Sequence, residues 1–406
     1  MVLRDLDKDI TYDYIMAGGG AAGLSLAYQV YQQSRRRPRI LIIDRDRKQH
    51  NDRTWCFWTP QATLFDSIVH HVWDRAEVIS EDFHRIYDLA PYQYKMIRGI
   101  DFYQAVRETL EPLPGITFLH QGVDEIQDSK YGAQVLVGGK AYVGTWVFDS
   151  LARLTGDTNL GGEDFNRYND LKQHFKGWEI ETQTDVFNPD VVRLFDFRTP
   201  QKGAMRFFYI LPFSRRRAMI EYTLFSHDLL KPHQYDHAIG EYIEKVLKVT
   251  DYRVTATESG VIPMTDRPFP RRLGHRVMAV GTKGGMVKPS TGYAFLRILK
   301  DSMAIARSLE DYGHPFAVPA TPWRYRLFDT LMLQVMASAE ENFRAKGSPQ
   351  DGERMKEIFI QLFRNNSIQQ IFAFLDETAA PPDNLRLMAS VPPAPFMKAF
   401  FKVILK

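Results

Sequence analysis

Three glycines and an aspartate near the start of the chain are the first residues suited to chemistry. Gly18, Gly20 and Gly23 fit the pattern G-x-G-x-x-G, which follows the apolar run 14–17 and opens a stretch with helical spacing. The first glycine permits a tight turn, the second lets a diphosphate approach the backbone, and the third lets helix and strand pack closely. The helix N-terminus offers N–H groups to the phosphates, and Asp44, at the end of the next apolar run, can accept hydrogen bonds from a ribose. The pattern predicts a dinucleotide site, with a glycine-rich turn in an ordinary βαβ unit as the alternative.

A second glycine-rich loop lies far along the chain. The apolar run 277–280 predicts a buried strand, residues 281–293 are rich in glycine, and residues 294–309 have the spacing of an amphipathic helix. Two such loops separated by a β-rich region indicate one extended dinucleotide held at both ends. FAD is favoured over NAD because an isoalloxazine ring needs a second backbone wall. The cofactor contacts predicted from the two loops, besides the first three glycines and Asp44, are Ala22, Gly281, Gly285, Met286, Thr291 and Gly292.

Composition narrows the class of protein. The 406 residues suffice for two or three packed units, and 44% hydrophobic with 25% charged residues is ordinary for a globular chain. A net charge of +3 is too small to argue for nucleic acid as a partner. Arginines cluster at 35–37, 215–217 and 271–272, which predicts either solvated loops or contact with anionic lipid.

Cysteine content and apolar runs bear on location. Cys56 is the only cysteine, which excludes an intramolecular disulfide and fits a reducing compartment. The first residues lack the apolar core of a signal peptide, and no apolar run approaches the ~18 residues needed to cross a bilayer. We therefore expect a cytosolic protein or one that lies on a membrane surface.

The middle of the chain predicts a sheet. Four runs between residues 172 and 260 have the length and composition of successive strands, which favours an antiparallel sheet that forms one wall of a substrate cavity. These runs are 177–182, 191–197, 205–211 and 217–225. Earlier, Trp55 and Trp58 indicate either a loop folded over a flat apolar ligand or an aromatic cluster that pins the loop.

The last hundred residues predict helices. Residues 325–344, 352–364 and 367–375 carry many Leu, Phe and Met. The segment 395–406 is short, apolar and studded with lysine, as expected either of an interfacial membrane helix or of the last helix of a lid.

Several motifs together resemble one family, the FAD-dependent lycopene β-cyclases, and in particular their bacterial branch. The resemblance covers most of the chain, and the proline–serine–threonine–glycine–tyrosine step at 289–293 is specific to this family and its near relatives. The matching segments are 18–23, 51–55, 194–198, 219–223, 260–264 and 285–293.

The resemblance implies a fold and its boundaries. The expected class is α/β: a two-domain flavoprotein with a Rossmann-type FAD-binding domain, an antiparallel β-sheet substrate domain and a C-terminal helical region. The FAD-binding domain is expected at 10–171 and 260–312, the substrate domain at 172–259, and a helical lid or membrane-facing region at 313–406. The resemblance also adds Arg53, Thr54 and Trp55 to the expected cofactor contacts.

The implied reaction is an isomerisation. A proton adds to the terminal double bond of a linear ψ end group of lycopene, a tertiary cation forms, the ring closes to a β-ionone ring, and a proton leaves. The flavin is implied to act in its reduced form, with NADPH as reductant, and to stabilise the cation electrostatically. The family further implies a peripheral protein on the cytoplasmic side of the bacterial membrane, with other enzymes of carotenoid biosynthesis as partners.

Glu221 is the candidate proton donor that the resemblance implies. It falls where the family carries the first glutamate of its acidic motif, within the apolar run 218–222. Strand alternation puts Met219 and Glu221 on one face and Ile220 and Tyr222 on the other. A carboxyl in an apolar pocket keeps its proton near pH 7 because desolvation raises its pKa. The alternative is a glutamate at the strand edge paired with one of the arginines 215–217.

Asp196 is the second catalytic candidate. It belongs to a step of aspartate, aromatic residue and arginine that resembles the family's, and it would donate the proton or orient the donor. The alternative is a salt bridge with Arg198. Glu377, in the helical region, is interpreted as structural or as part of the lid.

Three positions depart from the family pattern. Tyr222 stands where many cyclases have a second acid, which places the weight of the mechanism on Glu221. Thr282 follows Gly281 where related flavoproteins often carry aspartate, and Arg53 replaces a frequent histidine. Two other functions remain: a flavin monooxygenase acting on a polyene or other lipophilic substrate, and a carotenoid carrier without catalysis.

Overall fold

The computed structural model describes residues 11–151, 167–346 and 350–404. A mostly parallel sheet surrounds the first glycine turn, and its seven strands run in the order β8-β2-β1-β11-β10-β9, with β17 paired to β11. The strands β1, β2, β8, β11 and β17 are parallel neighbours, as expected of a dinucleotide-binding unit. Their bounds are β1 Tyr12–Ala17, β2 Ile40–Ile43, β8 Ile116–Leu119, β9 Glu125–Asp128, β10 Ala133–Val137, β11 Lys140–Asp149 and β17 Val277–Ala279.

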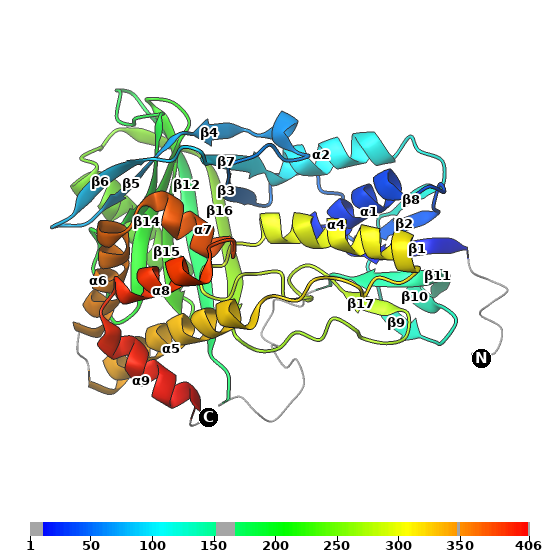
Figure 1. Ribbon diagram of the computed structural model, residues 1–406. Coiled ribbons are helices and arrows are strands. Elements are labelled where there is room, and N and C mark those ends of the chain that lie inside the picture. The colour runs from blue at the N-terminus through cyan, green and yellow to red at the C-terminus, as the bar shows by residue number, and fades with distance from the viewer. Residues whose placement is uncertain (1–10, 152–166, 347–349, 405–406) are drawn as a thin grey trace.

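Helices cover one face of this sheet. Met16 of β1 packs with the apolar side chains of these helices, while its neighbours Ile15 and Ala17 point to the other face and pack against β10. A strand alternates its side chains between faces, so β1 is buried on both sides. Figure 1 shows the helices beside β1 and β2: α1 (Ala21–Gln33), α2 (Gly99–Leu110) and α4 (Phe295–Tyr312). The strands and helices predicted around both glycine loops are therefore present.

A second sheet forms the other half of the molecule. Its seven strands run in the order β16-β12-β15-β14-β13-β5-β6, and the pairings are antiparallel except that between β13 and β5. The four strand runs predicted between 172 and 260 correspond to β12, β13, β14 and β15. The bounds are β5 Arg75–Ile79, β6 His84–Asp88, β12 Asp170–Thr182, β13 Val191–Asp196, β14 Met205–Pro212, β15 Arg217–Ser226 and β16 Tyr252–Thr265.

The predicted boundaries of the substrate domain differ from the structure. Strands β5 and β6 belong to the large sheet although they lie within 10–171, because β5 pairs in parallel with β13 over residues 75–79. Strand β16 runs through the expected boundary at 259–260 because it pairs with the whole length of β12. Neither the pairing of β5 nor the polar strand β16 has a local signal in the sequence.

A small third sheet joins the two halves. Strand β7 (Gln93–Arg98) lies between β3 (Thr54–Thr59) and β4 (His71–Trp73). The segment that follows Arg53 is thus a strand, and the loop predicted for Trp55 and Trp58 is wrong. The hydrogen bonds of β3 to β7 hold both tryptophans on a regular backbone.

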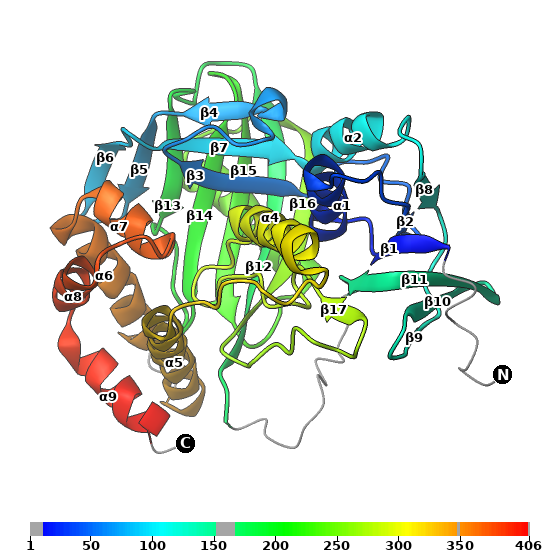
Figure 2. The same ribbon diagram turned by 45° about the vertical axis from the view of Figure 1, so that its right-hand side comes forward.

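The large sheet is covered on both faces. Ile220 and Tyr222 pack against α3 (Pro232–Glu241), a helix that the sequence patterns did not predict. The opposite face meets the C-terminal helices, which wrap around it in Figures 1 and 2. They are α5 Trp323–Lys346, α6 Gln350–Asn365, α7 Ile368–Leu375, α8 Pro381–Ala389 and α9 Pro393–Ile404. Among the described residues, no helix is long and apolar enough to cross a membrane.

Candidate active site

The turn between β1 and α1 has the geometry that a diphosphate site requires. Gly18 has a φ of +111°, a conformation that glycine adopts without strain. A Cβ on Gly20 would meet no atom within 4 Å, so the backbone there is open to a ligand. A Cβ on Gly23 would lie 1.9 Å from the Gly18 carbonyl oxygen, so only glycine allows α1 to pack this closely. The Gly19 N–H donates to Asp44 Oδ2 at 2.7 Å and fixes the acid beside the turn.

The loop between β17 and α4 faces this turn. Gly281 has a φ of +62°, and a Cβ there would lie 2.7 Å from Ala22 Cβ, so the two loops meet at these residues. Gly292, with a φ of +76°, lies against the side chain of Gln173. Within the described part of the chain, the buried hydroxyl of Thr291 has no hydrogen-bond partner. A buried hydroxyl without a hydrogen-bond partner is costly, so a hydrogen bond between Thr291 and a polar atom of a ligand would be favourable.

Two of the predicted cofactor contacts in this loop lie elsewhere. A Cβ on Gly285 would lie 3.1 Å from the side chain of Phe269, and the sulfur of Met286 is 3.9 Å from the guanidinium of Arg271. Neither residue lines the cavity described below, and their placement does not support direct contact with a cofactor. Gly285, with a φ of +78°, shapes the turn instead.

One cavity of about 1510 Å³ connects the two glycine loops with the large sheet and the C-terminal helices. Both glycine loops line one end of it, which fits an extended dinucleotide such as FAD. The predicted residues on its wall are Gly18, Gly20, Ala22, Asp44, Arg53, Thr54, Trp55, Gly281, Thr291 and Gly292.

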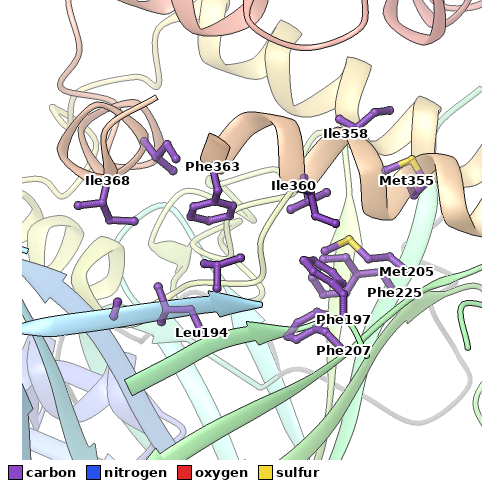
Figure 3. Packing of buried hydrophobic residues seen from close by; sticks show 14 of the residues in the cluster. Leu194, Phe197, Met205, Phe207, Phe225, Met355, Ile358, Ile360, Phe363 and Ile368 are labelled. Carbon is purple, nitrogen blue, oxygen red and sulfur yellow. The ribbon is translucent and has the colours of Figure 1, made fainter. Parts of the chain in front are cut away.

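The other end of the cavity is apolar and aromatic. Side chains of α6 face those of the large sheet, as Figure 3 shows for Phe363, Leu194 and Phe207. Phe195 lies between them, with ring centroids 4.7 Å from Phe207 and 5.5 Å from Phe363. The cavity reaches Phe396 of α9. Its far end therefore suits a long hydrocarbon.

Trp55 and Thr54 on β3 have partners in the protein. Trp55 stacks on Phe295 with centroids 5.3 Å apart and meets Phe102 edge-on at the same distance, which supports the aromatic-cluster interpretation. Thr54 donates its backbone N–H and its hydroxyl to Glu258, at 2.8 Å and 2.6 Å. The two groups of Thr54 thus hold a carboxylate, in addition to lining the cavity.

Glu221 lies on the cavity wall between the dinucleotide end and the apolar end. Burial in apolar surroundings raises its pKa to about 8, with an opposing hydrogen bond from Thr223 and a further upward effect from Glu258. Thr223 Oγ1 donates to Glu221 Oε1 at 2.6 Å. Met219 faces the cavity with Glu221, while Ile220 packs on the other side of the sheet, so the predicted alternation is confirmed.

The alternative of an arginine partner for Glu221 does not hold. Arg217 pairs with Glu179, and Arg215 and Arg216 both pair with Asp185 at the end of the hairpin. Glu221 is therefore a carboxyl that can hold its proton at neutral pH and present it to an apolar cavity.

Glu258 on β16 is a second cavity carboxyl, which the sequence analysis missed. In register, Gly177 of β12 is opposite Glu221 on one side and opposite Glu258 on the other. Residues directly opposite on adjacent strands point to the same face, so both acids face the cavity. An acid two residues before Gly260, in a run ending with apolar residues, was the one available signal.

Asp196 lies outside the cavity wall, in a buried network of ion pairs. Its carboxylate accepts hydrogen bonds from Arg193, Arg198 and Tyr242. Burial acts to raise the pKa of Asp196, but these partners outweigh it and the pKa lies below the ordinary value. A carboxylate held in its charged form does not favour proton donation near pH 7, and these contacts support the alternative of a salt bridge with Arg198.

Known proteins similar to this chain show which family it belongs to. The sequence model of the family described as "Lycopene cyclase protein" matches residues 13–400. The chain belongs to the lycopene cyclase family. It is 24% identical over 334 residues to a chloroplastic lycopene beta cyclase of Arabidopsis thaliana, covering 77% of this chain and 63% of the plant protein. The chain thus spans less than two thirds of that relative's length.

Solved structures share the fold of this lycopene cyclase family member. A geranylgeranyl bacteriochlorophyll reductase-like protein of Thermoplasma acidophilum superposes with a TM-score of 0.62 at 14% identity, over 96% of this chain and 98% of the other. The HpxO protein of Klebsiella pneumoniae, solved with FAD, gives a TM-score of 0.60 at 12% identity, over 94% and 99%. These likenesses show the fold, which is that of a two-domain flavoprotein.

The structure explains one departure from the lycopene cyclase pattern. Tyr222, at the position where many cyclases carry a second acid, points away from the cavity and stacks on Phe208 with centroids 4.9 Å apart. An acid at 222 would lie on the far side of the sheet from Glu221. In this chain the second carboxyl of the cavity comes from a different strand, at Glu258.

The helical region is tied to the family's proline–serine–threonine–glycine–tyrosine loop by buried charges. Lys288 lies 3.1 Å from Asp329 of α5 and 3.2 Å from Glu377, which follows α7. Ser290 also donates to Asp329, and Arg297 of α4 pairs with Glu377 at 2.6 Å. Glu377 is thus a structural residue that joins the helices to the loop carrying Thr291, which agrees with its sequence-based interpretation.

Proposed function

We propose that this lycopene cyclase family member converts the linear ψ end groups of lycopene into β-ionone rings, with FAD as its cofactor. The observation that carries the proposal is Glu221, a carboxyl with a pKa near 8 on the wall of an apolar cavity that continues into a dinucleotide cradle. A neutral carboxylic acid is what protonation of an alkene requires.

Glu221 begins the reaction and the aromatic cavity holds the chain. Its O–H bond breaks as a new C–H bond forms at the terminal double bond, which leaves a tertiary cation. The internal double bond of the end group attacks this cation and closes the ring, and loss of one proton restores a double bond. One proton enters and one leaves, so the product is an isomer and no oxidant or reductant is consumed.

Aromatic groups near Glu221 stabilise positive charge. Tyr209 lies opposite Glu221 on β14, and its hydroxyl hydrogen-bonds that of Tyr94 at 2.8 Å, which in turn bonds Tyr293 at 2.9 Å. Ring faces attract cations, more strongly where water is excluded. The two glycine loops would hold FAD, which in its reduced form, with NADPH as the proposed reductant, would supply negative charge that stabilises the cation.

We propose that α9 brings the protein to the membrane surface, on the cytoplasmic side. Its exposed side chains include Phe401, exposed by 60%, and Ile404, by 63%, while Lys398 and Lys402 flank them. An amphipathic helix with lysine beside apolar residues binds the interface of anionic bilayers. Phe396 of the same helix lines the cavity. A carotenoid dissolved in the membrane would therefore enter the cavity where the protein contacts the bilayer.

Replacing Phe401 with glutamate is expected to weaken binding to liposomes that contain anionic lipid by roughly ten-fold or more, because burial of one large apolar side chain contributes about 1.5–3 kcal/mol. Co-sedimentation with phosphatidylglycerol vesicles measures the effect. Leu64→Glu is the matched control, since Leu64 is 56% exposed but lies in the other half of the chain. If both variants lose the same amount of vesicle binding, α9 is not the part of the protein that contacts the membrane.

An anaerobic assay in D₂O tests the reaction. Purified protein, FAD, a chemical reductant and liposomal lycopene should give β-carotene carrying one deuterium per ring, because each ring gains one solvent proton at carbon. Oxygenated products that appear only with air and NADPH would instead indicate a monooxygenase. Lycopene that is bound but unchanged under both conditions would indicate a carotenoid carrier without catalysis.

A further inference from the structure

The carboxyl of Glu258 has a role still to be assigned. It lines the cavity, and Thr54 donates to both of its oxygens, the main-chain N–H to Oε1 and the hydroxyl to Oε2. The main-chain N–H can act only as a hydrogen-bond donor. A carboxyl group that accepts one hydrogen bond on each oxygen matches a carboxylate better than a protonated acid. Glu221 receives one such donor, from Thr223.

The two acids face each other across an open row of the sheet. Strands β15 and β16 flank β12, and Gly177 separates Glu221 from Glu258 by two strand spacings, roughly 10 Å between backbones. A Cβ at position 177 would lie 2.9 Å from Met219 Sδ and 3.5 Å from Glu221 Cβ, so a side chain there would intrude between the acids. Glycine thus adds no side chain of its own between the two acids, which line the cavity on either side of it.

The proposed cyclisation needs a proton acceptor as well as a donor. After ring closure the positive charge lies at C5, and a β ring forms only if the proton leaves the neighbouring C6. Loss from C4 or from the methyl group on C5 would give a different double-bond isomer. The position of the base therefore decides which double-bond isomer forms. The proton donor, on the other side of the ring, is poorly placed to remove the C6 proton.

We propose that Glu258 is a second catalytic residue, the base that accepts the C6 proton while Glu221 supplies the first. This inference rests on the proposed function. The C6–H bond breaks, its electron pair becomes the C5=C6 double bond, and the proton passes to a carboxylate oxygen of Glu258. Each turnover leaves Glu221 one proton short and Glu258 with one extra, and exchange with water restores both.

The hydrogen bonds to the two carboxyls differ, and this difference supports a paired acid and base. Desolvation raises the pKa of Glu258 above its ordinary value, and the two hydrogen bonds from Thr54 and the charge of Arg53, the residue before Thr54, act against this rise. Glu221 has the weaker opposition and holds its proton to about pH 8. Thr54 gives Glu258 two hydrogen-bond donors, whereas Thr223 gives Glu221 one, and unequal surroundings of this kind can assign one carboxyl as the base and the other as the acid.

The test compares Glu258→Gln with the wild-type holoenzyme in D₂O. We expect β-ring formation to fall by roughly 10²–10⁴-fold, the range for loss of a general base. The rings that still form should carry their double bond at C4–C5 or outside the ring, and recovered lycopene should contain deuterium because protonation becomes reversible. Glu181→Gln, on the exposed end of β12, is the control and should behave as wild type.

The outcomes separate the two proposals. β-Carotene formed by Glu258→Gln at the wild-type rate would overturn the role of Glu258 and leave the cyclase proposal intact. Complete inactivity without deuterium in recovered lycopene would also overturn it, because proton addition would then depend on Glu258. Failure of the wild type to cyclise lycopene would overturn the proposed function itself.

Thr54→Val gives an independent measurement should Glu258→Gln fail to retain flavin. It removes the hydroxyl that donates to Oε2 and keeps the main-chain N–H. The carboxylate loses stabilisation, so its pKa rises, and the acidic limb of the pH profile should move to higher pH with the alkaline limb unchanged. An unmoved acidic limb would contradict a base at Glu258.

Discussion

Glu221→Gln is expected to abolish cyclisation, with turnover lowered by roughly 10²–10⁴-fold or to the detection limit, the range for loss of a general acid. Glutamine has nearly the same shape and can still accept the hydrogen bond from Thr223, but it has no acidic proton to give. Turnover of liposomal lycopene under anaerobic, reducing conditions measures the loss. Flavin absorbance of the purified variant should match the wild type, because Glu221 lies beyond the two glycine loops.

The pH dependence gives the same prediction a second readout. The pKa of Glu221 is raised to about 8, so the donor is protonated at neutral pH and loses its proton as the pH rises through 8. Cyclisation should therefore fall above about pH 8. Folding is linked in the same direction: the protonated form is the one that the fold favours, so its contribution to stability declines between the ordinary pKa of 4.5 and 8. Glu221→Gln should flatten this part of the stability profile, and undiminished turnover by the variant would end the assignment.

Lys288→Met is expected to destabilise the protein by about 3–5 kcal/mol, the usual cost of removing one partner from a buried ion pair. Lys288 is only 3% exposed and lies within 3.2 Å of Asp329 and Glu377. Methionine fills a similar volume but leaves Asp329 as a buried charge without its cation. The midpoint of thermal unfolding should drop by several degrees, and flavin affinity should fall because the same loop carries Thr291.

Lys245→Met is the matched control for this substitution. Lys245 pairs with Glu241 on an exposed helix turn, and surface pairs contribute only about 0–1 kcal/mol. The unfolding midpoint of this variant should stay near that of the wild type. If Lys288→Met unfolds at the same temperature as Lys245→Met, the contact between the loop and the helical region does not support the cavity.

Local patterns carry enough information for the dinucleotide half of the protein. Gly18 and Gly23 stand where a turn and a close contact exclude larger residues, and Gly20 leaves the backbone between them open, so their spacing specifies the geometry. Strand alternation around Glu221 was equally informative, because a period of two puts Met219 on the same face as Glu221 and Ile220 on the other. The strands and helices of both glycine loops could therefore be predicted within a few residues.

The sequence by itself determined where a dinucleotide would lie and which face of β15 would carry an acid. Only the tertiary structure decided what surrounds that acid. Asp196 lies two residues before Arg198 in a motif that also suits catalysis, and its buried hydrogen bond from Tyr242 comes from a segment 46 residues away. Glu258 lies on a polar strand, 37 residues after Glu221, with only the nearby Gly260 and its apolar run as a local signal, and it reaches the same cavity because both strands pair with β12 at Gly177. Burial and the pairing of distant strands are properties of the packed chain, so a pair of facing acids becomes visible only once the sheet has formed.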